Sequence, residues 1–290
     1  MNMIIFGCGY SGTAIARAAM DLGAKVAGTT RTQDKAATLA TEGIAAFIFD
    51  GTELGDELRQ ALLQVTHLVQ SIPPGPMGDP LLKLTGGDLA TFCPNLEAIS
   101  YLSTVGVYGD QGGDWVDETV ECHPSPGRSQ ERLEAEQAWL EAGDAFGLPV
   151  SVLRLAGIYG PGRNAFVNLE KGTAKRIIKM GQVFNRIRVE DIAGATLFLG
   201  QGRCGGIFNI TDDEPAPPQD VVVEAARLMS VEPPPEQPFE TAQMSAMARS
   251  FYSANKKISN EKIRSLGFRF RFPRYQMSLQ DLWTTGKWRG

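Results

Sequence analysis

Three glycines near the start of the chain, Gly7, Gly9 and Gly12, have the spacing G-x-G-x-x-G. They follow a short apolar run and precede an alanine-rich segment, so the predicted order is strand, tight turn and helix. In this setting the first glycine permits the turn, the second lets a pyrophosphate approach the backbone, and the third lets the helix pack on the strand. The amide groups of Tyr10 and Ser11, in the first helical turn, would face the phosphates. The sequence therefore predicts a dinucleotide site at this turn.

The end of the second predicted strand, at Thr30 and Arg31, indicates which dinucleotide binds. A protein that uses NAD usually places Asp or Glu at this point, to hold the ribose 2′-hydroxyl. Here the chain offers hydroxyl groups and a guanidinium, with Lys35 a little further on, and such groups suit a 2′-phosphate. The residues favour NADP over NAD, with a solvated surface charge as the alternative for Arg31.

Two further predicted strands end in residues that could touch the cofactor. The third strand, residues 43–50, ends at Asp50, which would either contact the adenine amino group or cap the turn that follows. The fourth strand, residues 66–72, ends before a run of prolines, because proline cannot continue a central strand. Ser71 and Pro73 therefore stand at the carboxyl end of a strand, where ligands bind in doubly wound sheets.

The elements that position these residues alternate along the chain. A fifth strand is predicted at residues 98–104, a helix at 129–145 and a sixth strand at 150–155. Strands that alternate with helices at this rhythm predict an α/β fold, a Rossmann-type doubly wound parallel sheet with helices on both faces.

The composition is that of an ordinary globular protein, with 43% hydrophobic residues, 21% charged residues and a net charge of −5. An acidic chain gives no reason to expect nucleic acid or a membrane, so the expected partner is a small-molecule substrate. The first predicted strand begins close to Met1, which leaves no room for a secretory leader, and no apolar run reaches the length of a membrane span. A cytoplasmic location is expected. The cysteines and histidines are scattered singly, which predicts no metal site, and the sequence does not indicate an oligomeric state.

Several ordered blocks extend the pattern over nearly the whole chain. Besides the glycine turn, they are residues 102–109, 154–164, 185–193 and 208–215. With these blocks the chain resembles the extended short-chain dehydrogenase/reductase superfamily, in its NAD(P)-dependent epimerase/dehydratase branch. The resemblance implies a small polar or nucleotide-sugar-like substrate and two domains. These are an NAD(P)-binding Rossmann domain at 1–156, completed by about 187–211, and a small C-terminal substrate lobe formed by 157–186 and 212–290.

Enzymes of this superfamily use a Ser or Thr that orients a substrate hydroxyl, a Tyr that takes its proton, and a Lys four residues later. Thr104 matches the Ser/Thr position, but the Tyr-x-x-x-Lys pair is missing. One alignment places Pro126 and Gln130 at the two positions, and another places Arg128 and Arg132 there. An arginine cannot act as the base, because its guanidinium stays protonated.

Other residues could take over parts of this chemistry. Tyr108 and Tyr159 follow predicted strands and would face the expected cleft, so either could be the acid–base residue, as could a water. Arg128 or Arg132 would hold a substrate carboxylate or phosphate, or both would be solvated charges at a helix start. Arg163 and Asn164, in a block that keeps the superfamily pattern, are further substrate-binding candidates. Two functions stay open: an atypical NADP-dependent oxidoreductase or epimerase, and a catalytically inactive NADP(H)-binding regulatory or sensor protein.

A set of cations is expected around the mouth of the substrate lobe. Its members would suit a substrate that carries phosphate or carboxylate, and a solvated face is an equally open alternative. They are Lys171, Lys175, Arg176, Lys179, Arg186 and Arg188.

Overall fold

The computed structural model describes residues 1–290, apart from the side chain of Met247. The chain forms two compact units. The first contains Met1–Val107, Pro124–Leu155 and Ile192–Phe208, and the second contains Tyr108–His123, Ala156–Asp191 and Asn209–Gly290. The segment Tyr108–His123 therefore belongs to the second unit, whereas the sequence predicts it in the cofactor-binding domain.

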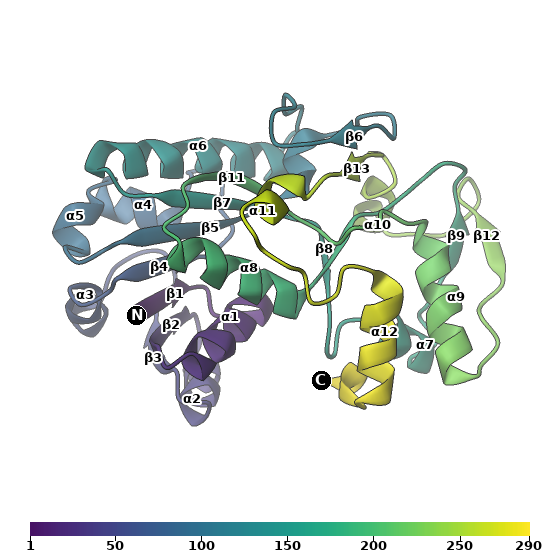
Figure 1. The fold of residues 1–290 in the computed structure, drawn as a ribbon, viewed down its shortest axis with the longest axis horizontal. Helices are drawn as coiled ribbons and strands as arrows, with labels where there is room; N and C mark the ends of the chain where they lie inside the picture. The colour runs from purple at the N-terminus through teal and green to yellow at the C-terminus, as the bar shows by residue number, and fades with distance from the viewer. The chain divides into compact units, whose positions relative to one another are not determined.

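The first unit is built around a seven-stranded sheet with the strand order β11-β7-β5-β4-β1-β2-β3 (Figure 1). The five strand pairs from β3 across to β7 are all parallel. The predicted Rossmann-type sheet is thereby confirmed. From β1 the chain moves outward to β3 and returns to β4 on the other side of β1, so ligands are expected at the carboxyl ends of β1 and β4. The strands are β1 (Asn2–Phe6), β2 (Lys25–Thr30), β3 (Ala45–Ile48), β4 (His67–Gln70), β5 (Ala98–Thr104), β7 (Val150–Leu155) and β11 (Gly206–Ile210).

Helices cover both faces of this sheet, with α4, α5 and α6 on one face and α1 and α8 on the other (Figure 1). Apolar residues at helical spacing produce this packing, as in α1, where Ile15, Ala16 and Ala19 are buried. Among the described residues, no helix has both the length and the apolar character needed to cross a bilayer. The helices are α1 (Tyr10–Asp21), α2 (Gln33–Thr41), α3 (Asp56–Leu62), α4 (Pro80–Thr85), α5 (Leu89–Phe92), α6 (Arg128–Phe146) and α8 (Val189–Gln201).

Aromatic pairs lie at the centre of the first unit. The Phe6 and Phe49 rings meet edge to face with their centroids 5.3 Å apart, and the Tyr101 ring stacks on Trp139 at 6.2 Å. The first pair joins β1 to the residue after β3, and the second joins β5 to α6. The core therefore fixes both the glycine turn that follows β1 and the helix α6.

The second unit contains short elements and three parallel strand pairs, β8–β10, β9–β12 and β6–β13. Its aromatic core includes Phe166, Trp283 and Trp288. The strands are β6 (Trp115–Val116), β8 (Gly157–Tyr159), β9 (Arg176–Ile178), β10 (Arg186–Arg188), β12 (Glu236–Pro238) and β13 (Lys257–Ile258). The helices are η1 (Val105–Tyr108), which runs into this unit, α7 (Ala165–Glu170), α9 (Pro218–Met229), α10 (Ala246–Ser250), α11 (Glu261–Ser265), α12 (Tyr275–Thr284) and η2 (Lys287–Arg289).

Two of the cations expected at the mouth of the lobe, Arg186 and Arg188, bind groups within the fold instead. Arg188 is 1% exposed and forms ion pairs with Glu190 at 2.7 Å and with Asp281 at 3.2 Å. Arg186 donates hydrogen bonds to the carbonyl oxygens of Phe184 and Ala216, at 2.8 and 3.0 Å. These two guanidinium groups are bound within the second unit, which corrects the expectation that they form part of an open basic surface.

Candidate functional site

The glycine turn follows β1 and is held by neighbouring strands. Gly7 has φ +84°, a conformation that favours glycine, and its N–H donates to Thr29 Oγ1 at 2.9 Å. The next amide, of Cys8, donates to the carbonyl oxygen of Thr29 at 2.8 Å. A Cβ atom on Gly7 would lie 2.9 Å from Ile72 Cγ1, so the loop after β4 contacts the turn. The turn thus lies at the switch point of the sheet.

Gly12 and Gly9 differ in the space around them. A Cβ on Gly12 would be 2.8 Å from the carbonyl oxygen of Gly7, so this glycine allows α1 to pack on the turn. A Cβ on Gly9 would have no neighbour closer than 4.0 Å. Gly9 is the N-cap of α1 and provides no side-chain cap, so the positive end of the helix dipole lies beside this open space. Open space and the positive helix end together fit the pyrophosphate of a dinucleotide.

Cationic and hydroxyl groups gather where β2 ends. Thr30 is the last residue of β2, and the exposed Arg31 follows directly. Thr32 is the N-cap of α2, and its hydroxyl accepts from the Lys35 amide at 3.4 Å while keeping its own proton to donate. Residues 29–33 contain no acidic side chain. This composition fits a ribose that carries a 2′-phosphate.

The residues after β3 and β4 reach the same edge of the sheet. Asp50 is exposed and accepts from the Thr52 amide at 2.9 Å and the Thr52 hydroxyl at 2.6 Å, which lowers its pKa. Of the two roles expected for Asp50, the structure shows the turn cap. Ser71 is half-buried and donates its amide to Phe6 at 2.9 Å, and Pro73 is exposed. Both lie in the loop that contacts the glycine turn.

Thr104 is the last residue of β5 and is half-buried. Its Oγ1 accepts the amide of Gly106 at 3.1 Å, which leaves the hydroxyl proton available to a ligand. Nearby, Arg132 of α6 donates to the carbonyl oxygen of Leu102, and its guanidinium lies 5.9 Å from the centroid of the Tyr101 ring. Arg128 begins α6 and is exposed. Arg132 is therefore held against β5, whereas Arg128 is open to solvent.

A buried network fixes α6 to the sheet. Glu136 is 2% exposed and accepts from the Ser103 hydroxyl at 2.5 Å and from Arg154 at 2.7 Å. A second nitrogen of Arg154, Nε, donates to the same carboxylate at 3.1 Å. The strands β5 and β7 and the helix α6 each supply one member of the network. The network therefore holds α6 against the sheet and positions its first turn next to Thr104.

Tyr108 is fully buried in the second unit, and its hydroxyl donates to Asn209 Oδ1 at 2.8 Å. A phenol whose proton is donated to a buried amide cannot exchange that proton with a substrate unless the side chain moves. This placement corrects the expectation that Tyr108 faces an open cleft and speaks against it as the acid–base residue.

Tyr159, at the end of β8, has a hydroxyl without exposed surface. Burial, and next the charge of Asp212, raise the pKa of Tyr159, while the nearby Ser278 hydroxyl lowers it. Among the described residues no atom completes a hydrogen bond of normal geometry to this hydroxyl, so Ser278 is a close neighbour and not a full partner. Tyr159 is therefore a neutral phenol at physiological pH.

The two remaining candidates are also in the second unit. Arg163 is exposed in a tight turn, where its amide donates to the carbonyl oxygen of Gly160 at 3.0 Å. Asn164 is the N-cap of α7, accepting from Val167 at 3.1 Å. Its Nδ2 donates to Gly160 at 2.8 Å and to Trp288 at 2.7 Å. The Asn164 side chain thus serves the fold, and we correct its assignment as a substrate-binding residue.

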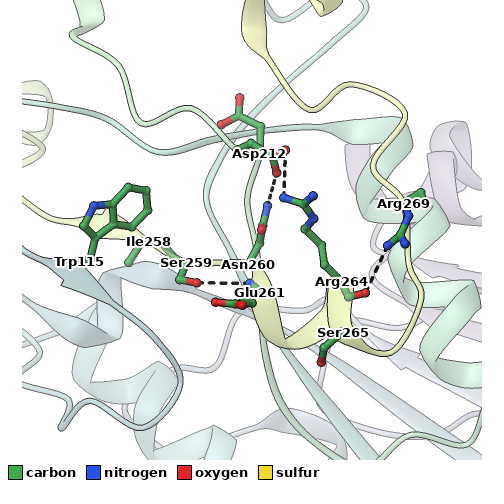
Figure 2. Close-up of a pocket in the computed structure, with 10 residues that line it drawn as sticks. Trp115, Asp212, Ile258, Ser259, Asn260, Glu261, Arg264, Ser265 and Arg269 are labelled. Atoms are coloured by element: carbon green, nitrogen blue, oxygen red, sulfur yellow. Dashed lines mark hydrogen bonds and ion pairs between the residues drawn. The ribbon is translucent and has the colours of Figure 1, made fainter.

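A cavity of about 600 Å³ lies in the second unit (Figure 2). Figure 2 shows Trp115 at one end and Arg269 at the other, with the α11 residues Glu261 and Arg264 between them. On its wall, Asp213 pairs with Arg264 at 3.2 Å and accepts from Asn260 at 2.8 Å. Asp213 and Arg264 satisfy one another, whereas Asp212 Oδ2, on the same wall, has no hydrogen-bond partner among the described residues. The cavity shares no residue with the candidates predicted from sequence.

The sheet, its switch point and the glycine turn define a Rossmann-type protein that binds NAD(P). Residues 87–210 match the model of the NAD dependent epimerase/dehydratase family. The chain is 31% identical to Protein YeeZ of Escherichia coli (strain K12) over 287 residues, which cover 94% of this chain and 96% of that protein. The chain belongs to the NAD-dependent epimerase/dehydratase family, which confirms the resemblance seen in the sequence.

Solved structures share the fold over nearly the whole chain. A conserved protein of unknown function from Silicibacter pomeroyi DSS is 40% identical, with a TM-score of 0.90 and 99% of each chain covered. UDP-N-acetylglucosamine 4-epimerase from Bacillus cereus has a TM-score of 0.78 at 17% identity, with 100% of each chain covered. Human epimerase family protein SDR39U1 (isoform 2), solved with NADPH, has a TM-score of 0.73 at 17% identity and covers 98% of this chain and 99% of its own. The last two likenesses describe the fold alone.

Proposed function

We propose that this protein is an NADP-dependent oxidoreductase or epimerase that acts on a small polar substrate of the nucleotide-sugar kind. The observation that carries the cofactor preference is the end of β2, where Thr30, Arg31 and Lys35 stand and residues 29–33 include no acid. Support for the substrate class comes from the Bacillus cereus neighbour, whose name is that of a nucleotide-sugar epimerase.

In this proposal each part of the sheet edge has one task. The open face of Gly9 and the first turn of α1 hold the pyrophosphate, and Arg31 with Thr30 holds the 2′-phosphate. Asp50 lines the cofactor site on its adenosine side, and Ser71 and Pro73 line it from the loop after β4. When bound, the cofactor supplies hydride transfer at its nicotinamide. Thr104 orients the reacting oxygen, and the exposed Arg128 and Arg163 attract anionic groups of the substrate.

Proton transfer has to proceed without the superfamily's tyrosine and lysine. Since Tyr108 donates to Asn209, the remaining candidates are Tyr159 and a water. Burial raises the pKa of Tyr159, so this side chain stays protonated near neutral pH and cannot serve as a base there. To act as a proton donor its side chain would have to move, because the hydroxyl has no exposed surface. The proposal includes a cytoplasmic location, which agrees with four cysteines that form no disulfide bond among the described residues.

The test is turnover with a panel of nucleotide sugars in the presence of NADP, followed by absorbance and by the distribution of isomers. Conversion of at least one member supports the enzyme. If Tyr159→Phe retains turnover, water and not Tyr159 carries out the proton transfer.

The alternative is a regulatory or sensor protein that binds NADP(H) and has lost the chemistry. The missing Tyr-x-x-x-Lys pair and the buried hydroxyl of Tyr108 favour it. Cofactor binding without conversion of any member of a broad panel is the outcome that selects this alternative.

A further inference from the structure

Two hydroxyl groups, of Thr104 and Ser129, lie close to Gly106 at the exit of β5. We propose that Thr104 and Ser129 together bind one oxygen atom of the substrate, a carbonyl or hydroxyl oxygen, by donating a hydrogen bond each. The inference rests on the proposed function for the identity of the ligand, and it adds Ser129, which is not among the site residues predicted from the sequence.

The geometry comes from the distances around Gly106. A Cβ on this residue would lie 3.2 Å from Ser129 Oγ and 3.3 Å from Thr104 Oγ1. The two hydroxyls therefore lie next to Gly106 on the side where a Cβ would be, one from β5 and the other from the first turn of α6. Both residues are half-buried, so a small ligand can reach them while bulk water is partly excluded.

Position 106 requires glycine because a side chain would meet the two hydroxyls, and not because of its backbone conformation. The φ angle of Gly106 is outside the positive region, so an alanine could adopt the conformation. Its methyl group, however, would be in tight contact with both hydroxyls. The absence of a side chain keeps the space between Thr104 and Ser129 open.

The hydroxyls are also suitable donors. Thr104 Oγ1 already accepts the Gly106 amide at 3.1 Å, so its own proton is available to a second acceptor. Two preorganised donors aimed at one oxygen stabilise the negative charge that develops there when a carbonyl is reduced. Neither hydroxyl titrates near neutral pH, so their contribution should not vary with pH.

The position of Ser129 is fixed by the rest of α6. Ser129, Arg132 and Glu136 are spaced by three and four residues, which places them on one face of the helix. Arg132 donates to the carbonyl oxygen of Leu102, and Glu136 accepts from the Ser103 hydroxyl. Both partners precede Thr104 directly in β5. Ser129 is thus held beside β5 by contacts one and two turns away along the helix.

The first experiment needs no substrate. In a crystal structure of the ligand-free protein, we expect one water within hydrogen-bond distance of both Thr104 Oγ1 and Ser129 Oγ, and we expect Gly106→Ala to exclude it. Hydroxyls that turn away from each other, or that bond directly with no shared water, would overturn the proposal.

The second experiment uses the nucleotide sugar converted in the panel. Ser129→Ala and Thr104→Val should each lower kcat by about a hundredfold, by the same factor at about pH 6.5 and pH 8.5. The NADPH dissociation constant should change by less than about twofold, which shows that the fold is intact. Ser125→Ala, in the exposed loop before α6, is the matched control and should keep full activity.

Full turnover by Ser129→Ala would reject the assignment of Ser129, whatever the result for Thr104. If no member of the panel is converted, the proposed function fails. The crystallographic experiment then still decides whether the two hydroxyls share an oxygen.

Discussion

Arg31 shows how much a single exposed side chain can decide in this fold. It follows the last residue of β2, where an acidic residue would oppose a 2′-phosphate and a guanidinium attracts one. Because the Arg31 side chain is exposed, its replacement should not destabilise the fold. Its contribution to cofactor binding can therefore be measured in a folded variant.

Arg31→Ala should weaken NADPH binding by about tenfold to a hundredfold, because a charge-assisted contact with the 2′-phosphate is lost. Affinity for NADH, which lacks this phosphate, should change by less than about twofold. Fluorescence titration with both cofactors measures the two constants. Lys25→Ala is the control, since Lys25 is exposed at the other end of the same strand. Equal affinities of the unmodified protein for NADPH and NADH would contradict the role of Arg31 in binding the 2′-phosphate.

The glycines of the turn should separate folding from binding. Gly9→Ala adds a methyl group to space that only a ligand would fill, so we expect unchanged thermal stability and NADPH binding weakened by about tenfold or more. Gly12→Ala places a methyl group against the Gly7 carbonyl, so it should lower the free energy of unfolding by about 1–3 kcal/mol. Thermal denaturation and NADPH titration of both variants provide the comparison, which fails if Gly9→Ala binds normally.

At the scale of elements, α6 supplies several residues of the candidate site and shows which of its features the sequence can predict. Its core residues recur at helical spacing, and the sequence predicted residues 129–145 against the observed Arg128–Phe146. The sequence could not predict that Glu136 pairs with Arg154, because that contact joins a helix to a strand through tertiary packing. For the same reason a tyrosine after β5 was expected in a cleft, while its partner Asn209 lies 101 residues further along the chain.

Glu136→Gln should lower the free energy of unfolding by about 3–5 kcal/mol, because it leaves the Arg154 guanidinium buried without its counter-charge. Glu42→Gln is the matched control: it removes the same charge from the surface pair with Arg17, and we expect a loss of about 0–1 kcal/mol. Urea denaturation of both variants measures the difference. Similar losses in the two variants would contradict the structural role of the network.

At the scale of the whole molecule, the alternation of strands and helices was enough to predict the parallel sheet, since apolar runs bounded by turns are local signals. The second unit has an aromatic core but also contains buried polar contacts between distant residues, which have no such local signal. Asp191 is an example, 2% exposed, with its carboxylate accepting from the amides of Arg271 and Phe272, at 2.6 and 2.9 Å.

Burial raises the pKa of Asp191 to about 6. A raised pKa means that the folded state binds the proton more tightly, so the stabilisation is complete at low pH and is lost as the pH rises to about 6. Relative to Asp191→Asn, which does not titrate, the native protein should lose about 2 kcal/mol of stability between pH 4 and pH 7. Urea denaturation at the two pH values tests this, with the exposed Asp21→Asn as control. A stability difference that does not change with pH would contradict it.

The buried ion pair of α6 also bears on how such a protein can change over evolutionary time. Glu136 and Arg154 anchor the helix two turns beyond its amino end, so the helix does not depend on the side chains of its first turn for its position. Substitutions in that turn can therefore accumulate without unfolding the protein. A lineage can lose the tyrosine and lysine of its ancestors and keep the scaffold, on which selection can then act for a different catalytic arrangement.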